Sequence, residues 1–196
     1  CTAFFGANAG AWALPKPALP VYCLGFTAAT NGVTVLCPDA AVGDVGVVNG
    51  VEYTKRDRDG LLALVGTSEE AKLATSCTSG VTDMSSLFKD ASSFNVKIGS
   101  WDTSSVTTMK DMFDGTFFFN QDISKWNTAV VKNMQGMFDG ARAFNQDLSS
   151  WNVDKVGSAC AYFDANAVKW SQPKPALPTS CIGFRIASNG VTVLCP

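Results

Sequence analysis

A repeat of 25 residues constrains the fold of this chain more than any other feature of its sequence. Three gapless copies occupy 81–105, 106–130 and 131–155, and a degenerate fourth copy occupies 156–170. One unit of this length cannot bury its own apolar face, so successive units must pack on one another. Aromatic residues recur in register, in one column as Trp101, Trp126 and Trp151 and in another as Phe88, Phe113, Phe138 and Phe163.

Each unit is expected to form a short helix followed by a short strand. Its apolar residues fall at positions 1, 4, 7 and 8, which is a helical spacing, and an extended I-x-x-W piece follows. The predicted fold class is therefore an α/β repeat, a short leucine-rich-repeat-like solenoid of about four 25-residue rungs. Asparagines in register would form a ladder that satisfies backbone groups of the turns: Asn95, Asn120 and Asn145.

A second period of 158 residues contains the first. The segment 15–38 recurs as 173–196 with 18 of 24 positions identical, and 3–12 resembles 161–170 at the same offset. We therefore expect one module plus an overlap from a longer tandem array. The predicted order is a tail of the preceding module's last repeat (1–14), a Pro-rich linker and hairpin (15–38), an α/β N-terminal cap (39–80), the repeats (81–170), and a linker and hairpin to the next module (171–196).

The cap and the linkers carry short local signals. Asn49-Gly50 and Asn31-Gly32 are typical of tight hairpin turns. Residues 59–64 and 68–73 are expected to form two short helices, the second capped by Ser68, and Asp57-Arg58-Asp59-Gly60 indicates a helix start rather than a calcium loop. The two PKPALP segments predict stiff, extended connectors at the module junctions, built on Pro15, Pro17 and Pro20 and on Pro173, Pro175 and Pro178.

The repeat signature M-x-x-M-F…F-N-Q-D-I-S-x-W-x-T-S-x-V-T-x-M, which covers Val81 to Phe163, resembles a known family. It is similar to the BspA-like, or bacterial-surface-protein, family of lipoprotein-type 25-residue leucine-rich-repeat-like units. The preceding stretch resembles the N-terminal cap of such repeats in microbial-eukaryote surface proteins. The resemblance implies a secreted or surface-displayed protein, with adhesion among the family's activities and no catalytic residues to transfer.

Composition excludes several classes of function. The chain has no histidine, so Ser-His-Asp and Cys-His chemistry and histidine metal sites are impossible. Its formal net charge is −2, with no basic stripe of the kind that a nucleic-acid-binding protein needs. No apolar run approaches the roughly 18 residues of a membrane span. We therefore expect no enzyme, no cofactor, no nucleic-acid partner and no membrane span.

Seven cysteines lie far apart with no CxxC pair, which favours disulfides and an extracellular or cell-surface location. Four cysteines per period allow three pairings. A Cys23–Cys37 bond would leave Cys77 with Cys160, about 14 Å away by unit spacing, beyond the ~7 Å that a disulfide spans. Sequential pairing is therefore favoured: Cys1–Cys23, Cys37–Cys77 and Cys160–Cys181, with Cys195 left for the next module.

Two further features are candidate sites. Asp122 and Asp147 share a column and are candidate Ca²⁺ ligands, but Lys97 interrupts that column and an ordinary turn role is favoured. Phe117 and Phe118 precede the core residue Phe119, so they are candidates for an exposed contact surface. The aromatic columns could also stack carbohydrate, although their period favours a core.

Two hypotheses of function follow. The first is a structural module of an extracellular filament or cell-surface array, assembled head to tail from copies of itself with a 158-residue period. The alternative is a cell-surface adhesion or ligand-binding repeat module. The chain contains no N-x-[ST] sequon, and its Ser, Thr and Pro content is compatible with glycans attached through oxygen.

Overall fold

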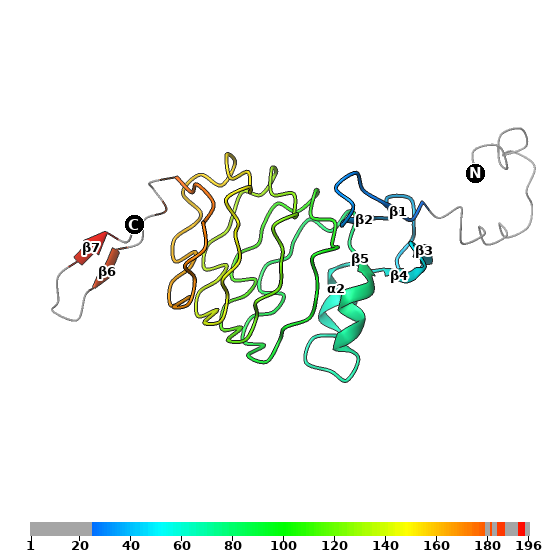
Figure 1. The fold of residues 1–196 in the computed structure, drawn as a ribbon, viewed down its shortest axis with the longest axis horizontal. Coiled ribbons are helices and arrows are strands. Elements are labelled where there is room, and N and C mark those ends of the chain that lie inside the picture. The colour runs from blue at the N-terminus through cyan, green and yellow to red at the C-terminus, as the bar shows by residue number, and fades with distance from the viewer. Residues whose placement is uncertain (1–24, 179–180, 182–183, 187–191, 195–196) are drawn as a thin grey trace, which may run out of the picture.

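The computed structural model describes residues 25–178, 181, 184–186 and 192–194. A small group of strands and short helices lies at one end, and the repeat region extends away from it (Figure 1). The strands β6 (Phe184–Ile186) and β7 (Thr192–Leu194) pair antiparallel beyond the far end of the repeats.

Two hairpins, one with a two-residue turn and one with a longer loop, build the N-terminal part. Strands β3 (Val45–Val48) and β4 (Val51–Lys55) pair antiparallel around Asn49-Gly50, whose φ angles of 52° and 80° suit a two-residue turn. Strand β5 (Ser76–Cys77) adds to β4 in parallel. Strands β1 (Thr27–Ala28) and β2 (Val35–Leu36) form the second hairpin, around Asn31-Gly32. Both hairpins that the sequence predicts are therefore confirmed.

Two short helical segments complete the cap, residues 39–80. Helix α2 (Arg58–Leu62) begins after Asp57, whose carboxylate accepts a hydrogen bond from the Gly60 N–H at 2.9 Å, so the expected helix start is confirmed. The second segment, η2 (Glu70–Thr75), is a 3-10 helix with no side-chain cap, so the expected cap at Ser68 is wrong. Both segments direct a buried leucine, Leu61 or Leu73, into the main core.

The expected fold class is wrong. The protein is small and mostly β, with few strands and little helix among its described residues. Residues 81–178 contain neither a helix nor a named strand, so leucine-rich-repeat rungs built from a helix and a strand do not form. The physical reason lies in the backbone: positive φ angles at Ser86, Asp111 and Gly136, the sixth position of each of the three units, interrupt the expected helices, and successive turns meet the 1-4-7-8 apolar spacing instead.

In residues 81–170, called here the turn stack, some backbone N–H groups close turns within their own unit, and others donate to carbonyls of the following unit. The N–H of Met84 donates to the Thr108 carbonyl at 3.0 Å, and that of Met109 donates to the Asn133 carbonyl at 2.9 Å. Isolated parallel bridges join Asp83 to Thr108 and Thr108 to Asn133. Non-local hydrogen bonds therefore replace the expected helical ones.

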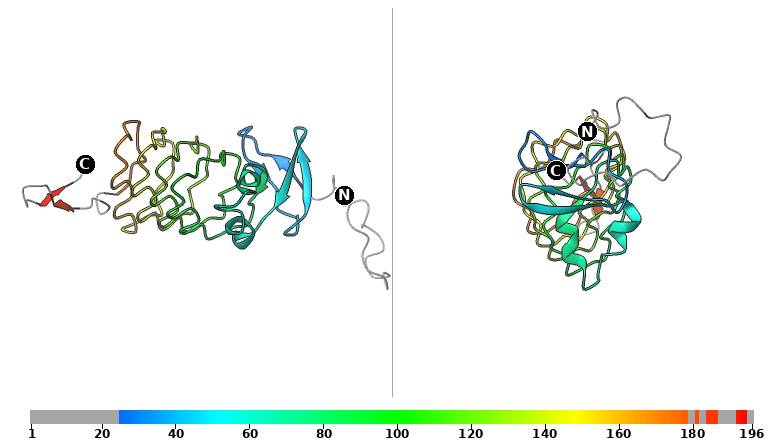
Figure 2. Two further views of the ribbon diagram at one scale, coloured as in Figure 1. Left: turned by 90° about the horizontal axis from the view of Figure 1, so that it is seen from below. Right: turned by 90° about the vertical axis from the view of Figure 1, so that its right-hand side faces the viewer.

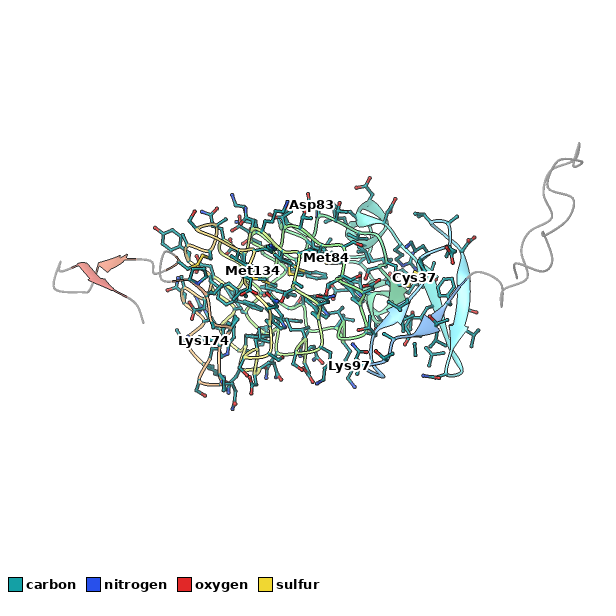
Figure 3. All side chains as sticks on the ribbon, turned by 90° about the horizontal axis from the view of Figure 1, so that it is seen from above. Cys37, Asp83, Met84, Lys97, Met134 and Lys174 are labelled. Carbon is teal, nitrogen blue, oxygen red and sulfur yellow. A yellow bond between two sulfur atoms is a disulfide. The ribbon has the colours of Figure 1, made fainter. Side chains whose placement is uncertain are left out.

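Three aromatic columns fill the interior of the turn stack (Figure 2 shows the stack from two further sides). Ring centroids of residues one unit apart lie 5.3–5.7 Å apart in the phenylalanine columns and 6.3 Å apart in the tryptophan column. Each indole N–H of this last column donates to a carbonyl of the preceding segment, and that of Trp101 reaches Leu73 in the cap at 2.9 Å. Figure 3 shows Met84 and Met134 inside the stack.

The fourth unit leaves this register by one residue. The Phe113 N–H donates to Met137, 24 positions on, whereas the Phe138 N–H donates to Phe163, 25 positions on. The Phe163 backbone therefore takes the position of Met137, and its ring follows Phe138 in the column at a centroid distance of 5.4 Å but edge-on, at 78°, rather than stacked. Trp170 closes the neighbouring column, likewise edge-on.

Candidate functional site: the module junctions

The described part of the first recurring segment lies against the cap. We call residues 26–37 the first hairpin. The Phe26 ring lies over Gly46, where a Cβ atom would come within 2.2 Å of it, so only glycine fits there. The Val35 N–H donates to the Ser100 carbonyl at 2.8 Å. The first hairpin thus contacts both the cap and the first unit of the turn stack.

Cys37 carries the densest contacts of the first hairpin. Its sulfur forms a disulfide with Cys77, with the two Cα atoms 6.3 Å apart. Its N–H donates to the Ser79 hydroxyl at 3.0 Å, and its carbonyl accepts from the Lys55 ammonium at 3.3 Å. Cys37 lies at the boundary between the cap and the turn stack in Figure 3.

Lys55 is the buried cation of this junction. Its ammonium also donates to the Ser79 carbonyl, and the Ser79 hydroxyl donates to the Asp102 carboxylate at 2.5 Å. Burial lowers the pKa of Lys55, and the Asp102 charge opposes that shift. The network connects three segments that are far apart in sequence. It could not be predicted from the sequence, because nothing in the pattern around Lys55 marks that lysine as buried.

A cavity of about 350 Å³ opens beside Lys55 and is lined also by Arg58 and Asp83. Arg58 donates to the backbone carbonyls of Asp83 and Ser85, at 3.4 and 2.6 Å. Burial opposes ionisation of Asp83, but hydrogen bonds from Ser85 and the Arg58 charge outweigh it and lower the pKa of this carboxyl. Arg58 and Asp83 thus already bind groups that join the cap to the first unit. Neither side chain is available as a catalytic group in this cavity.

At the other end, residues 173–178, the terminal linker, lie back on the last units. The Pro173 carbonyl accepts from the Leu148 N–H at 2.9 Å, Pro175 is buried, and Leu177 packs against the core. Lys174 pairs with Asp164 at 2.5 Å. The linker is thus a packed element rather than a free tether.

The described disulfides are two of the sequentially predicted pairs. Besides Cys37–Cys77, Cys160 is bonded to Cys181, with Cα atoms 4.9 Å apart. The latter bond ties the chain three residues beyond the terminal linker to the fourth unit. The remaining predicted junction residues lie outside the described residues: Cys1, Cys23, Cys195, Pro15, Pro17 and Pro20.

The calcium candidates serve their own turns. The Asp122 carboxylate accepts from the Ser124 N–H, and the Asp147 carboxylate accepts from the Ser149 N–H, both at 2.9 Å. Hydrogen bonds from Ser149 lower the pKa of Asp147. Within the described part of the chain, no three Cys, Asp or Glu side chains gather as a metal site would require.

The asparagine ladder, two residues before the aspartate column in each unit, is confirmed. The side-chain oxygen of Asn95 accepts from the Asn120 N–H at 3.0 Å, and that of Asn120 accepts from the Asn145 N–H at 2.9 Å. Asn145 continues the series to the N–H of Ser171 at 2.8 Å, directly before the terminal linker. The ladder therefore ends where the linker begins to pack.

The aromatic pair of the second unit is exposed. Phe117 is 38% and Phe118 is 65% exposed. The Arg142 guanidinium lies over the Phe117 ring, 4.5 Å from its centroid, a contact that spans two units and that the sequence analysis missed. Phe118 therefore offers the freer surface of the two.

The chain is a repeat protein in which a disulfide-bonded cap precedes 25-residue sequence repeats. The family described as "Mycoplasma protein of unknown function, DUF285" matches residues 63–174, which is more than half of the chain. The chain belongs to this family. Comparisons with curated proteins and with solved structures found no match. Among the described residues, no helix has the length and apolar character that crossing a membrane requires.

Proposed function

We propose that this protein is a structural module of an extracellular filament or cell-surface array, joined head to tail with a period of 158 residues. The observation that carries the proposal is the recurrence of 15–38 as 173–196, with 18 of 24 positions identical. A segment repeated at both ends of a module has the same surroundings in every module, which is what an open head-to-tail assembly requires.

The packing of both ends supports this proposal. The first hairpin is bonded to the cap through Cys37–Cys77, and Cys181, just beyond the terminal linker, is bonded to Cys160 of the fourth unit. The two copies of the segment thus display complementary halves of one junction. Disulfides at both ends also suit an oxidising, extracellular location.

Electron microscopy of native extracellular material, labelled with an antibody to the turn stack, tests this function. We expect thin filaments that bind the antibody at an axial period on the order of 40–60 Å, from four units, a cap and a linker. Labelled particles of single-module length, with no filaments at high protein concentration, would contradict the proposal.

The exposed Phe117–Phe118 pair favours adhesion as a second candidate function. Exposed aromatic rings suit stacking on sugar rings or docking on an apolar protein surface. In this case Phe118→Ala should abolish binding to cells or to immobilised glycans. Val168→Ala, which removes a side chain that is 77% exposed in another unit, is the matched control. Equal binding by both variants would remove this candidate.

A further inference from the structure

The backbone N–H groups that join neighbouring units recur at four positions of each unit. In the third unit the donors are Met134, Gly136, Phe138 and Gly140, and the acceptors are the carbonyls of Ala159, Ala161, Phe163 and Ala165. The second and fourth donors have a positive φ angle in every unit, 61° and 69° in the third. Each unit thus presents one row of donors to the unit that follows it.

The fourth unit has the same row of donors but no acceptors for it. The row consists of the N–H groups that directly follow its acceptor residues: Cys160, Tyr162, Asp164 and Asn166. The φ angles of the second and fourth are 59° and 60°, so the backbone geometry of the other units is kept. None of the four N–H groups donates to an acceptor among the described residues. We call this row the open edge.

The opposite end of the turn stack is closed. The acceptor row of the first unit begins with the carbonyls of Asp83 and Ser85, and the Arg58 guanidinium donates to both, at 3.4 and 2.6 Å. The cap therefore replaces a preceding unit there. A row of unpaired backbone N–H groups is a template on which another backbone can pair, so the open edge is the end of the stack at which a partner can add.

The residues of the open edge favour a neutral acceptor. The Asp164 carboxylate belongs to the same row as the donors, and it would repel an anion placed against them. The Tyr162 ring is 58% exposed and adds apolar surface to the row. Backbone carbonyls next to an exposed apolar side chain match both features.

Strand β3 offers such carbonyls at the other end of the described molecule (Figure 1). Its one neighbour among the described strands is β4, so β3 is an edge strand. The Lys55 N–H donates to the Asp44 carbonyl at 2.8 Å, and the alternation of an antiparallel pair then directs the polar backbone groups of Val45 and Val47 away from β4. The Val47 side chain is 55% exposed.

The 158-residue period brings these two edges together. Cys181 is bonded to Cys160 of the fourth unit and corresponds to Cys23 at that offset. Three residues after Cys23 comes Phe26, whose ring lies over Gly46 of β3. Three extended residues reach about 11 Å at most. In a head-to-tail array, β3 of each module therefore lies close to the fourth unit of the module before it.

We propose that the open edge binds strand β3 of the next copy of this chain. The carbonyls of Val45 and Val47 accept from N–H groups of the open edge, and the Val47 side chain packs on the Tyr162 ring. The proposal rests on the proposed head-to-tail assembly and names a backbone contact within it.

Hydrogen exchange in a tandem chain tests this contact. The tandem repeats residues 39–196 directly after Pro196, so that a second module follows the first at the 158-residue period. We expect exchange at Tyr162, Asp164 and Asn166 of the first module to slow by about tenfold or more relative to the 196-residue chain. The linkage makes the contact intramolecular, so even a weak one is populated. The amides of Met84 and Met109, which are already bonded, should exchange equally in both proteins.

Val47→Pro in the second module should abolish the slowing, because a proline ring on an edge strand blocks the approach of another backbone. The N–H of Val47 does not pair with β4, so the hairpin should still form. The matched control is Val47→Pro in the first module, whose β3 follows no fourth unit, and there the slowing should remain. If the second cap of the variant fails to form its disulfide, Val47→Lys replaces it with the same expected loss.

Three results would overturn the proposal. One is equal exchange at the open edge in the tandem and in the 196-residue chain. Another is slowing that survives Val47→Pro in the second module, because a different surface would then cover the edge. The third is slowing of the 196-residue chain by dextran sulfate with none in the tandem, which would assign the edge to an anionic glycan. Each leaves the filament function standing, because electron microscopy tests that function separately.

Discussion

The cap and the turn stack must both bury apolar side chains and pair their backbone groups, and they do so by different means. The cap uses paired strands, a disulfide and a buried lysine, and the small core that it shares with the first hairpin has four buried apolar residues, Val35, Cys37, Val48 and Cys77. The turn stack has no strand or helix and relies on aromatic columns and hydrogen bonds between units. A small core buries too little apolar area to be stable without cross-links. Stacked units bury enough apolar area in one continuous aromatic interior.

Removing one ring from an aromatic column should lower the free energy of unfolding more than any other change considered below. Phe113→Ala removes a fully buried ring that stacks on Phe88 and Phe138, so the free energy of unfolding should fall by about 3–5 kcal/mol. Phe118→Ala, an exposed ring in the same unit, should change it by less than about 0.5 kcal/mol. Urea denaturation followed by tryptophan fluorescence measures both. Equal losses would contradict the assignment of the two rings.

Removing the cap disulfide should separate the two regions. Cys37→Ser with Cys77→Ser should destabilise the cap by about 2–4 kcal/mol, because the bond closes a long loop. Hydrogen exchange should then accelerate in β3, β4 and β5 far more than at the inter-unit amides of Met84 and Met109. Uniform acceleration along the chain would show that cap and stack unfold as one unit.

Lys55→Met tests how much the buried lysine contributes to the stability of the cap. The substitution leaves the Cys37 and Ser79 carbonyls without their donor, so we expect a loss of about 1–3 kcal/mol. Lys97→Met, at an exposed position of the first unit, is the control and should be nearly neutral. Because burial lowers the pKa of Lys55, the unfolded chain binds its proton more tightly. Stability should therefore rise with pH up to the ordinary lysine pKa, and this rise should be absent from Lys55→Met.

The elements of the cap could be predicted from short stretches of sequence, whereas the backbone of the turn stack depends on hydrogen bonds between units. The hairpin at Asn49-Gly50 and the helix start at Asp57 depend on neighbouring residues only, and both form as expected. The apolar spacing around Met109 fits a helix and a series of turns equally well. What selects turns is the positive φ at Asp111 and the bond from the Met109 N–H to the next unit, and no short window contains that bond.

Some contacts of the module junctions could likewise be predicted from the sequence, and others could not. Chain geometry was enough to favour Cys37–Cys77 and Cys160–Cys181, because the alternative required too long a reach. The Lys55 network was not predictable, because it exists only when segments around Cys37, Ser79 and Asp102 meet. Burial of Pro175 likewise depends on the last units, which the linker sequence does not describe.

The smallest expected effect lies at the exposed turns of the stack. Hydrogen bonds from Ser149 lower the pKa of Asp147, so its charged form contributes stability above the ordinary aspartate range, and that contribution is lost as pH falls through the lowered pKa. Asp147→Asn should therefore be slightly less stable than the unaltered chain at pH 7, with the difference closing in acid. Ser149→Ala, which removes the hydroxyl donor at 2.7 Å and keeps the backbone one, should show part of the same change. Thermal unfolding of the three proteins between about pH 2 and pH 7 measures it, and a difference that persists unchanged at the acid end would show that Asp147 acts through its shape rather than its charge.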